Sequence, residues 1–162
     1  MLDVLDGVDA EAVEIGESVQ FTVRPNRACH LLLINVATDG NLYVLYPNGL
    51  AESQRLERNE TFTLPREFAI TVAEPAGIEM VKAIISTDPI PLPATADELR
   101  KMQIYQLPPE ASAKFIQDLA LNTLSQRPGV DWAVETLSFP VGEWSSDTSA
   151  LSKEPIEEII LD

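Results

Sequence analysis

The sequence contains few of the residues on which most catalytic and metal sites depend. Among 162 residues there is one cysteine, Cys29, and one histidine, His30. A single cysteine cannot form an internal disulfide, which favours a reducing compartment such as the cytoplasm. A single histidine excludes a zinc site built from several His and Cys ligands, and it excludes a Ser-His-Asp triad that uses any other histidine.

Cys29 and His30 are adjacent, but they do not form a catalytic pair. They open an apolar stretch that is typical of a β-strand, and neighbouring strand residues point to opposite faces of a sheet. His30 therefore cannot take the Cys29 proton by direct contact. We expect a buried structural cysteine beside a partly exposed histidine.

Basic residues are also scarce, with 11 Lys and Arg against 26 Asp and Glu and a net charge of -15. Residues 1–20 contain six acids and no base, and residues 128–162 contain eight acids and one base. Nucleic acids and anionic membranes bind to clustered Lys and Arg, so this charge disfavours both. The acidic ends keep the domain soluble; alternatively, one of them docks on a basic partner.

Long apolar runs and a secretory signal are absent as well. No run reaches the roughly 18 residues that a membrane-spanning helix needs. The first residues, MLDVLDGVDAEAVEIGE, carry acids and no Lys or Arg, whereas a secretory signal has a basic start and an uninterrupted apolar centre. We therefore expect no signal peptide and no membrane insertion, although a domain separated from its signal would look the same.

What the sequence does have is a succession of short strands. The stretch 30–49, HLLLINVATDGNLYVLYPNG, predicts two strands joined by a tight turn at Asp39-Gly40. Both strands are almost entirely apolar, so both faces of the pair should be covered. Further strands are predicted over 19–23, 62–64, 68–72, 78–87 and 130–141. Short strands with turns roughly every 8–12 residues indicate an antiparallel β-sandwich of about seven or eight strands.

The last predicted strand changes its pattern midway. Trp132 and Val134 occupy one parity, whereas Leu137, Phe139 and Val141 occupy the other. A slip of one residue at 135–136 would place all five on one face, which predicts a β-bulge there and Trp132 in the core.

A two-helix insertion is predicted before that strand. Pro89, Pro91 and Pro93 mark an extended connector. Thr95 and Glu98 have the spacing of a capping box and predict a short helix that buries Leu99 and Met102. Pro108-Pro109 opens a second helix. The predicted organisation is one domain over 1–144, with a core at 14–90, the helical excursion at 95–127 and the return strand at 130–141, followed by an acidic tail at 145–162.

No catalytic, cofactor or metal residue is predicted. Asp39-Gly40-Asn41 shares residue types with calcium loops but lacks their alternating oxygen ligands and distal Glu. Glycines occur singly at turns, unlike a phosphate-binding loop. Candidates for a binding surface of the sandwich are Tyr43, Tyr46, Trp144 and Arg24. The alternative is that these aromatic side chains simply pack.

One pattern runs through three segments: Gly16-Glu17-x-Val19-x-Phe21-x-Val23, the apolar strand 29–34, and Asp39-Gly40-x-Leu42-x-Val44-Leu45-Tyr46-Pro47-Asn48. This pattern resembles a bacterial family known as domain of unknown function 4384. The stretch Glu74-Pro75-x-Gly77-x-Glu79-x-Val81-Lys82-Ala83-Ile84 is similar to the closing strand of that family. The resemblance covers about residues 14–90. The strand before the hairpin more often opens with an aromatic residue, where this chain has Cys29-His30.

The resemblance implies an accessory domain of a larger bacterial protein, often beside a caspase-like peptidase or a protein kinase, with no assigned activity of its own. We therefore expect a non-catalytic interaction or regulatory module that presents a β-sandwich surface to a protein partner or a neighbouring domain. Strand addition by an extended peptide is one available binding mode. The alternative is a small-ligand or carbohydrate-binding module that uses Tyr43 and Tyr46.

Overall fold

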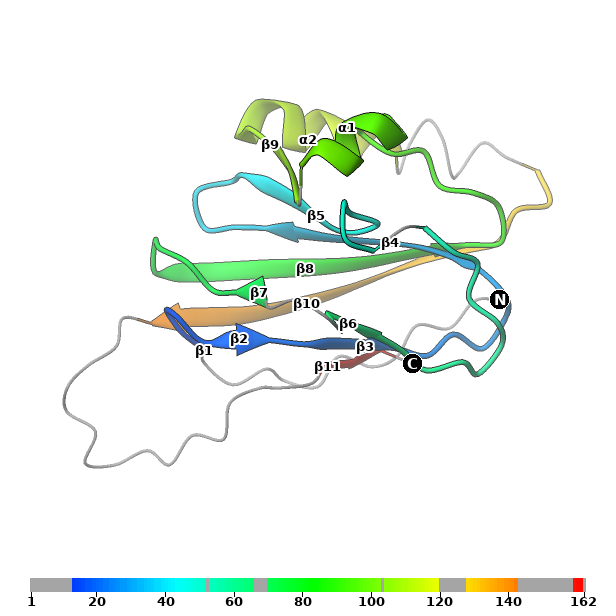
Figure 1. Cartoon of the computed structure of the whole chain (residues 1–162), viewed down its shortest axis with the longest axis horizontal. Coiled ribbons are helices and arrows are strands. Elements are labelled where there is room, and N and C mark those ends of the chain that lie inside the picture. The colour runs from blue at the N-terminus through cyan, green and yellow to red at the C-terminus, as the bar shows by residue number, and fades with distance from the viewer. Residues whose placement is uncertain are drawn as a thin grey trace.

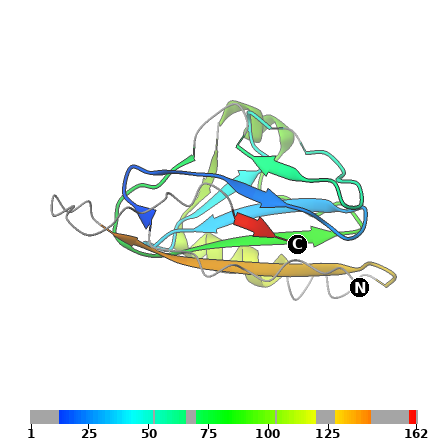
Figure 2. The ribbon, with the colours of Figure 1, turned by 90° about the horizontal axis from the view of Figure 1, so that it is seen from below.

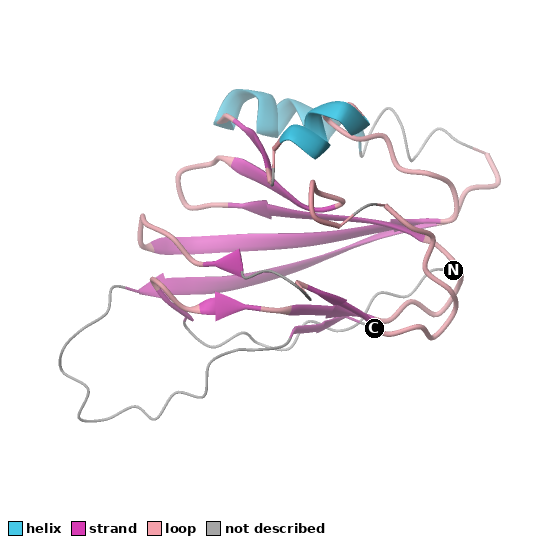
Figure 3. Ribbon diagram, in the orientation of Figure 1, coloured by secondary structure: helices cyan, strands magenta, loops and turns pink. Residues whose placement is uncertain are grey.

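The computed structural model describes residues 13–51, 53–65, 70–102, 104–119, 128–142 and 159–161. Over these residues the fold is mainly β with two short helices, which confirms the predicted β-sandwich with a helical insertion (Figure 3). The elements in chain order are β1 (Val13–Glu14), β2 (Ser18–Val19), β3 (Phe21–Val23), β4 (His30–Val36), β5 (Leu42–Tyr46), β6 (Phe62–Leu64), β7 (Ile70–Thr71), β8 (Gly77–Ser86), α1 (Ala96–Lys101), β9 (Tyr105–Leu107), α2 (Pro109–Asp118), β10 (Trp132–Gly142) and β11 (Ile159–Leu161).

The sandwich has one large sheet and a second layer of shorter strands. The large sheet has the order β1-β10-β8-β4-β5-β9. Its neighbouring strands pair antiparallel, except that β1 runs parallel to β10. The second layer consists of the order β11-β3-β6 and the pair β2-β7. Figure 2 shows the long strands β8 and β10 beneath this layer. β11 lies within 145–162, the predicted acidic tail, and it pairs in parallel with β3.

The main core fills the space between the two layers. The large sheet contributes side chains of one parity from its long strands, and the second layer contributes side chains from β3 and β6. Buried members include Leu31, Leu33, Leu45, Val81, Ile85, Phe139, Phe21, Val23, Phe62 and Leu64. Burial of such apolar side chains is the dominant favourable term in folding.

The opposite face of the large sheet is covered by α2. Leu32, Ile34, Leu42 and Val44 form a second buried cluster with Leu119, and Phe115 and Ile116 of α2 pack against it. The prediction that both faces of the β4–β5 hairpin are covered is therefore confirmed. Figure 1 shows both helices at the β5–β9 end of the sheet, away from β10.

The hairpin turn forms where the sequence predicts it, as a three-residue loop. Ala37 donates from its amide to the Asn41 carbonyl, and its own carbonyl accepts from the Gly40 amide, both at 2.9 Å. Gly40 has a φ of +86°, a left-handed conformation that glycine adopts without steric cost. The Asp39 carboxylate accepts from the Asn41 amide at 2.9 Å, so this acid serves the turn.

The exit of the hairpin is organised by Asn48, which is 3% exposed. Its side-chain nitrogen donates to the Leu45 carbonyl, and its side-chain oxygen accepts from the amides of Leu50 and Ala51, each at 2.7 Å. These bonds satisfy backbone groups that no strand pairing reaches. The Tyr-Pro-Asn segment therefore has a structural role.

The predicted bulge in the last strand is wrong. β10 pairs with β8 residue for residue from Trp132 to Val141, without a register shift. Apolar residues occur at both even and odd positions because the two ends of β10 bury opposite faces of the strand. Phe139 and Val141 face the inter-sheet core, whereas Trp132 packs, partly buried, against the α2 cluster. The bulge occurs instead between β4 and β5, where the register shifts at Leu33/Ile34.

The helical insertion begins as predicted and contains one unpredicted strand. Thr95 and Glu98 form a complete capping box at the start of α1, and Pro109 begins α2. Leu99 is buried as expected, but Met102 is exposed. Between the helices, β9 pairs with β5 and extends the large sheet.

Candidate functional site

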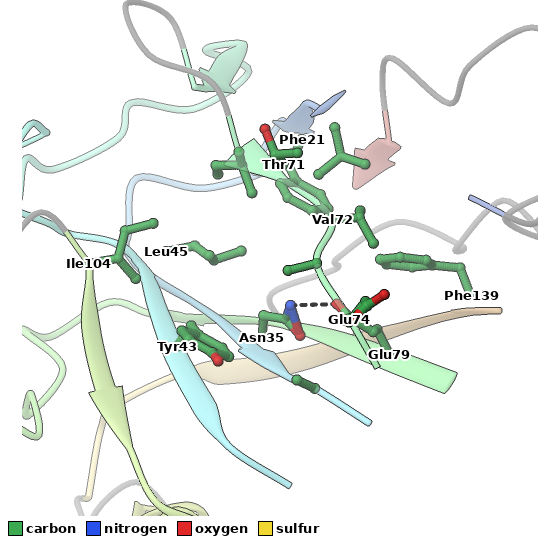
Figure 4. A pocket seen from close by; sticks show the side chains of 14 residues that line it. Phe21, Asn35, Tyr43, Leu45, Thr71, Val72, Glu74, Glu79, Ile104 and Phe139 are labelled. Atoms are coloured by element: carbon green, nitrogen blue, oxygen red, sulfur yellow. Dashed lines mark hydrogen bonds between the residues drawn. The ribbon is translucent and has the colours of Figure 1, made fainter. Parts of the chain in front are cut away.

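A cavity of about 300 Å³ lies between the large sheet and the β2–β7 pair. Figure 4 shows Tyr43, Asn35 and Glu79 on the large sheet, with Phe21, Thr71 and Val72 on the opposite side. Most of the wall is apolar. A mostly apolar, concave site with a few convergent polar groups is the usual form of a small-ligand pocket.

The polar groups of this cavity centre on Glu79, a buried residue that is only 6% exposed. Its carboxylate accepts a hydrogen bond from the Asn35 side-chain nitrogen at 2.8 Å. The side-chain oxygen of Asn35 is buried and has no hydrogen-bond partner among the described residues. A buried acceptor without a donor is costly, so this corner of the cavity can accept a further hydrogen bond.

Burial raises the pKa of the Glu79 carboxyl above its ordinary value of 4.5, and the negative charge of Asp39 raises it further. Because this pKa is higher in the folded state, the folded protein binds the proton more tightly than the unfolded chain does. The protonated Glu79 carboxyl therefore contributes to stability at low pH. This contribution is lost as the pH rises from the ordinary pKa of the carboxyl through its raised pKa in the folded protein.

The Glu79→Gln variant is accordingly expected to be more stable than the wild type at pH 8, by about 1 kcal/mol, and equally stable at pH 4. The other acids near this group, Asp39 and Glu74, and the cavity tyrosine, Tyr43, are left unchanged. Urea unfolding at the two pH values measures the difference. A Gln variant that is less stable at pH 8 would show that the charged carboxylate stabilises the fold.

The structure separates the residues that the sequence analysis proposed for a binding surface. Tyr43 lines the cavity. Tyr46 is 1% exposed and belongs to the core, where its ring packs against Phe62. Arg24 is exposed just after β3 and does not line the cavity. Trp144 lies outside the described residues.

Cys29 and His30 lie as their strand positions predict. Cys29 is fully buried and pairs with Leu56 in an isolated bridge, while His30 is half-buried. Burial raises the pKa of the Cys29 thiol to about 11, although Arg55 acts in the opposite direction. A thiol with so high a pKa is a poor nucleophile at neutral pH.

Sequence reasoning missed Glu79 and Asn35, although a signal for each was present. Glu79 has the same parity in β8 as the core residues Val81 and Ile85, and Asn35 has the same parity in β4 as Leu33. A polar residue at an apolar position of a strand predicts a buried polar group, which requires a partner or a ligand.

A second candidate site is the outer edge of β10. Among the described strands, only β1 pairs with this edge, at Val141 and Gly142. The Gly142 carbonyl accepts from Ile15 on the outer side, whereas the Asp131 carbonyl accepts from Thr87 on the β8 side. Backbone groups alternate along a strand, so the even-numbered residues from Trp132 to Pro140 direct theirs outward.

Among the described residues, no group of three or more His, Cys, Asp or Glu side chains is placed to hold a metal ion. No helix in the described part of the chain is long and apolar enough to cross a bilayer.

Comparison with known proteins gives one match. The family model described as "Domain of unknown function (DUF4384)" matches residues 12–89, which run from the residue before β1 to the connector after β8. No curated protein and no solved structure matches the chain. The expected resemblance is confirmed over this segment: residues 12–89 match the family model of DUF4384.

Proposed function

We propose that this chain is a non-catalytic accessory module of a larger protein, which binds an extended segment of a partner polypeptide by strand addition to β10. The observation that carries the proposal is the outer edge of β10 between Trp132 and Pro140, with which no described strand pairs. Main-chain hydrogen bonds along such an edge supply affinity, and side chains beside it supply specificity.

The edge has few of the features that normally block strand addition. Natural edge strands are kept short, bulged or charged, often with lysine or proline. β10 is long and regular, its pairing with β8 has no bulge, and its stretch 132–139 contains no lysine and no proline. Pro140 interrupts the row of outward amides next to β1. Proline is tolerated there because its nitrogen faces away from β8.

The side chains beside the edge supply apolar contact area for a partner. Val134 is 40% exposed, and Ile78 on the neighbouring strand β8 is 57% exposed. Both lie on the α2 side of the sheet, beyond the part that α2 covers. The net charge of -15 favours a partner segment that carries few acids.

Amide hydrogen exchange on the full chain tests whether the edge is free. The amides of Val134, Thr136 and Ser138 are expected to exchange much faster than those of Glu135 and Leu137, which bond to β8. Equal protection of both sets would show that another part of the chain already pairs with this edge, and would overturn the proposal.

Proline variants then test binding. Random-sequence peptides displayed on phage are selected on the full chain, and binders are measured against Val134→Pro and Thr136→Pro. Each variant removes one outward amide, so affinity should fall at least about tenfold while unfolding changes by less than about 1 kcal/mol. Glu135→Pro is the matched control, because it removes an amide that bonds to β8 and should cost about 3 kcal/mol of stability. Peptides that bind both outward-proline variants normally would contradict strand addition.

A further inference from the structure

The cavity beside Glu79 has a charge pattern that selects one kind of ligand. The charged side chains that line it are Glu74 and Glu79, and the described lining contains no Lys, Arg or His. Asp39, in the hairpin loop, adds a third negative charge close enough to act on Glu79. A mostly apolar cavity with a negative interior favours a cation over an anion or a neutral molecule.

The hydrogen-bonding groups of the cavity further restrict the kind of ligand that it can bind. The Glu79 carboxylate accepts from Asn35 through one of its oxygens, and the Asn35 side-chain oxygen accepts from no group in the described part of the chain. The Glu79 carboxylate and the Asn35 side-chain oxygen can both accept a further hydrogen bond, so a ligand has to bring N–H or O–H donors. A primary ammonium carries three donors and a positive charge, whereas its apolar body can contact Phe21, Val72 and Phe139.

We propose that this cavity binds a primary ammonium group carried on an apolar body, with Glu79 and Asn35 as its acceptors. The site lies inside the sandwich, so it is separate from the strand-addition edge and goes beyond the proposed function. The ammonium can come from a free arylalkylamine or from a lysine side chain of a bound peptide, since the two share the same donor group.

Calorimetric titration of the full chain with 2-phenylethylammonium chloride tests the proposal. Saturable binding is expected, with 2-phenylethanol at least tenfold weaker and phenylacetate without measurable binding. A short capped peptide with one lysine is titrated in parallel. Binding of the amine identifies a small-molecule site, and binding of the peptide alone identifies a lysine pocket. Equal binding of the amine and the alcohol, or no binding of any probe, would overturn the proposal.

Variants locate the binding and separate a specific contact from general charge. Glu79→Gln should weaken amine binding at least tenfold without loss of folding. Glu74→Gln removes an exposed acid at the rim and should weaken binding by less than threefold. Ala37→Leu adds volume to the cavity wall and should weaken amine binding at least tenfold. Equal losses in the two Gln variants, or normal binding by Ala37→Leu, would contradict a site at Glu79.

Discussion

Replacing Tyr46 with alanine is expected to destabilise the domain by about 4 kcal/mol, as a buried aromatic residue in a core does. The Tyr46 side chain is 1% exposed, and its ring centroid lies 4.6 Å from that of Phe62 at an interplanar angle of 57°. Its hydroxyl oxygen accepts from the Gln54 amide at 2.8 Å. The variant therefore leaves both a cavity and an unpaired amide. Urea unfolding measures the loss.

Tyr46→Phe is the matched control, because it keeps the ring and removes only the hydroxyl acceptor, at a cost of about 1 kcal/mol. Tyr43→Ala supplies the contrast at the cavity and should change unfolding by about 1 kcal/mol or less. A Tyr46→Ala protein that is as stable as Tyr43→Ala would show that Tyr46 is a surface residue after all. If Tyr46→Ala is destabilised as expected, a loss of binding in this variant reports unfolding and does not place Tyr46 in a binding site.

Replacing Gly49 with alanine is expected to cost about 3 kcal/mol, the upper range for inserting atoms into a packed region. A Cβ at this position would lie 2.6 Å from the carbonyl oxygens of both Leu99 and Met102. These are backbone atoms at the end of α1, so they cannot rotate away as a side chain can. Either the hairpin exit or α1 has to move. Thermal or urea unfolding measures the cost.

Gly142→Ala is the control for this variant, because a Cβ there meets no atom within 4 Å. Its free energy of unfolding should stay within about 0.5 kcal/mol of the wild type. If Gly49→Ala were equally harmless, α1 would not be docked on the hairpin exit. The comparison thus tests the contact between the family-matched segment and the helical insertion.

These two predictions assign a structural role to the Leu-Tyr-Pro-Asn-Gly segment, the part of the sequence that most closely resembles the family. Tyr46 packs in the core, Asn48 satisfies the turn, and Gly49 admits the end of α1. Binding is proposed elsewhere, at the β10 edge and in the cavity beside Glu79. Sequence motifs that mark a family can therefore record folding requirements instead of a binding site.

The sequence predicted the features that depend on residues close together in the chain. The hairpin at Asp39-Gly40, the capping box at Thr95 and Glu98, and the proline start of α2 all form as expected. Each is decided by local backbone preferences and by hydrogen bonds between near neighbours. The alternation of apolar residues likewise indicated the sandwich.

Other features depended on contacts between distant segments. The alternation in β10 predicts a bulge only if the strand buries a single face along its whole length. In the folded protein the core covers one face near Phe139 and the α2 cluster covers the other face near Trp132. β9 was missed for a similar reason, since three residues form a strand only where β5 offers them a partner.

By itself, the sequence determined the hairpin, the helix starts, the β-sandwich class and the family resemblance, because local conformational preferences and periodicity act within a few residues. Only the tertiary structure decided that β8 lies between β4 and β10, that Asn35 meets Glu79, and that the outer side of β10 is mostly unpaired among the described strands. Those features depend on which strands become neighbours. Strand order is set by the packing of residues far apart in the chain, and no local pattern encodes it.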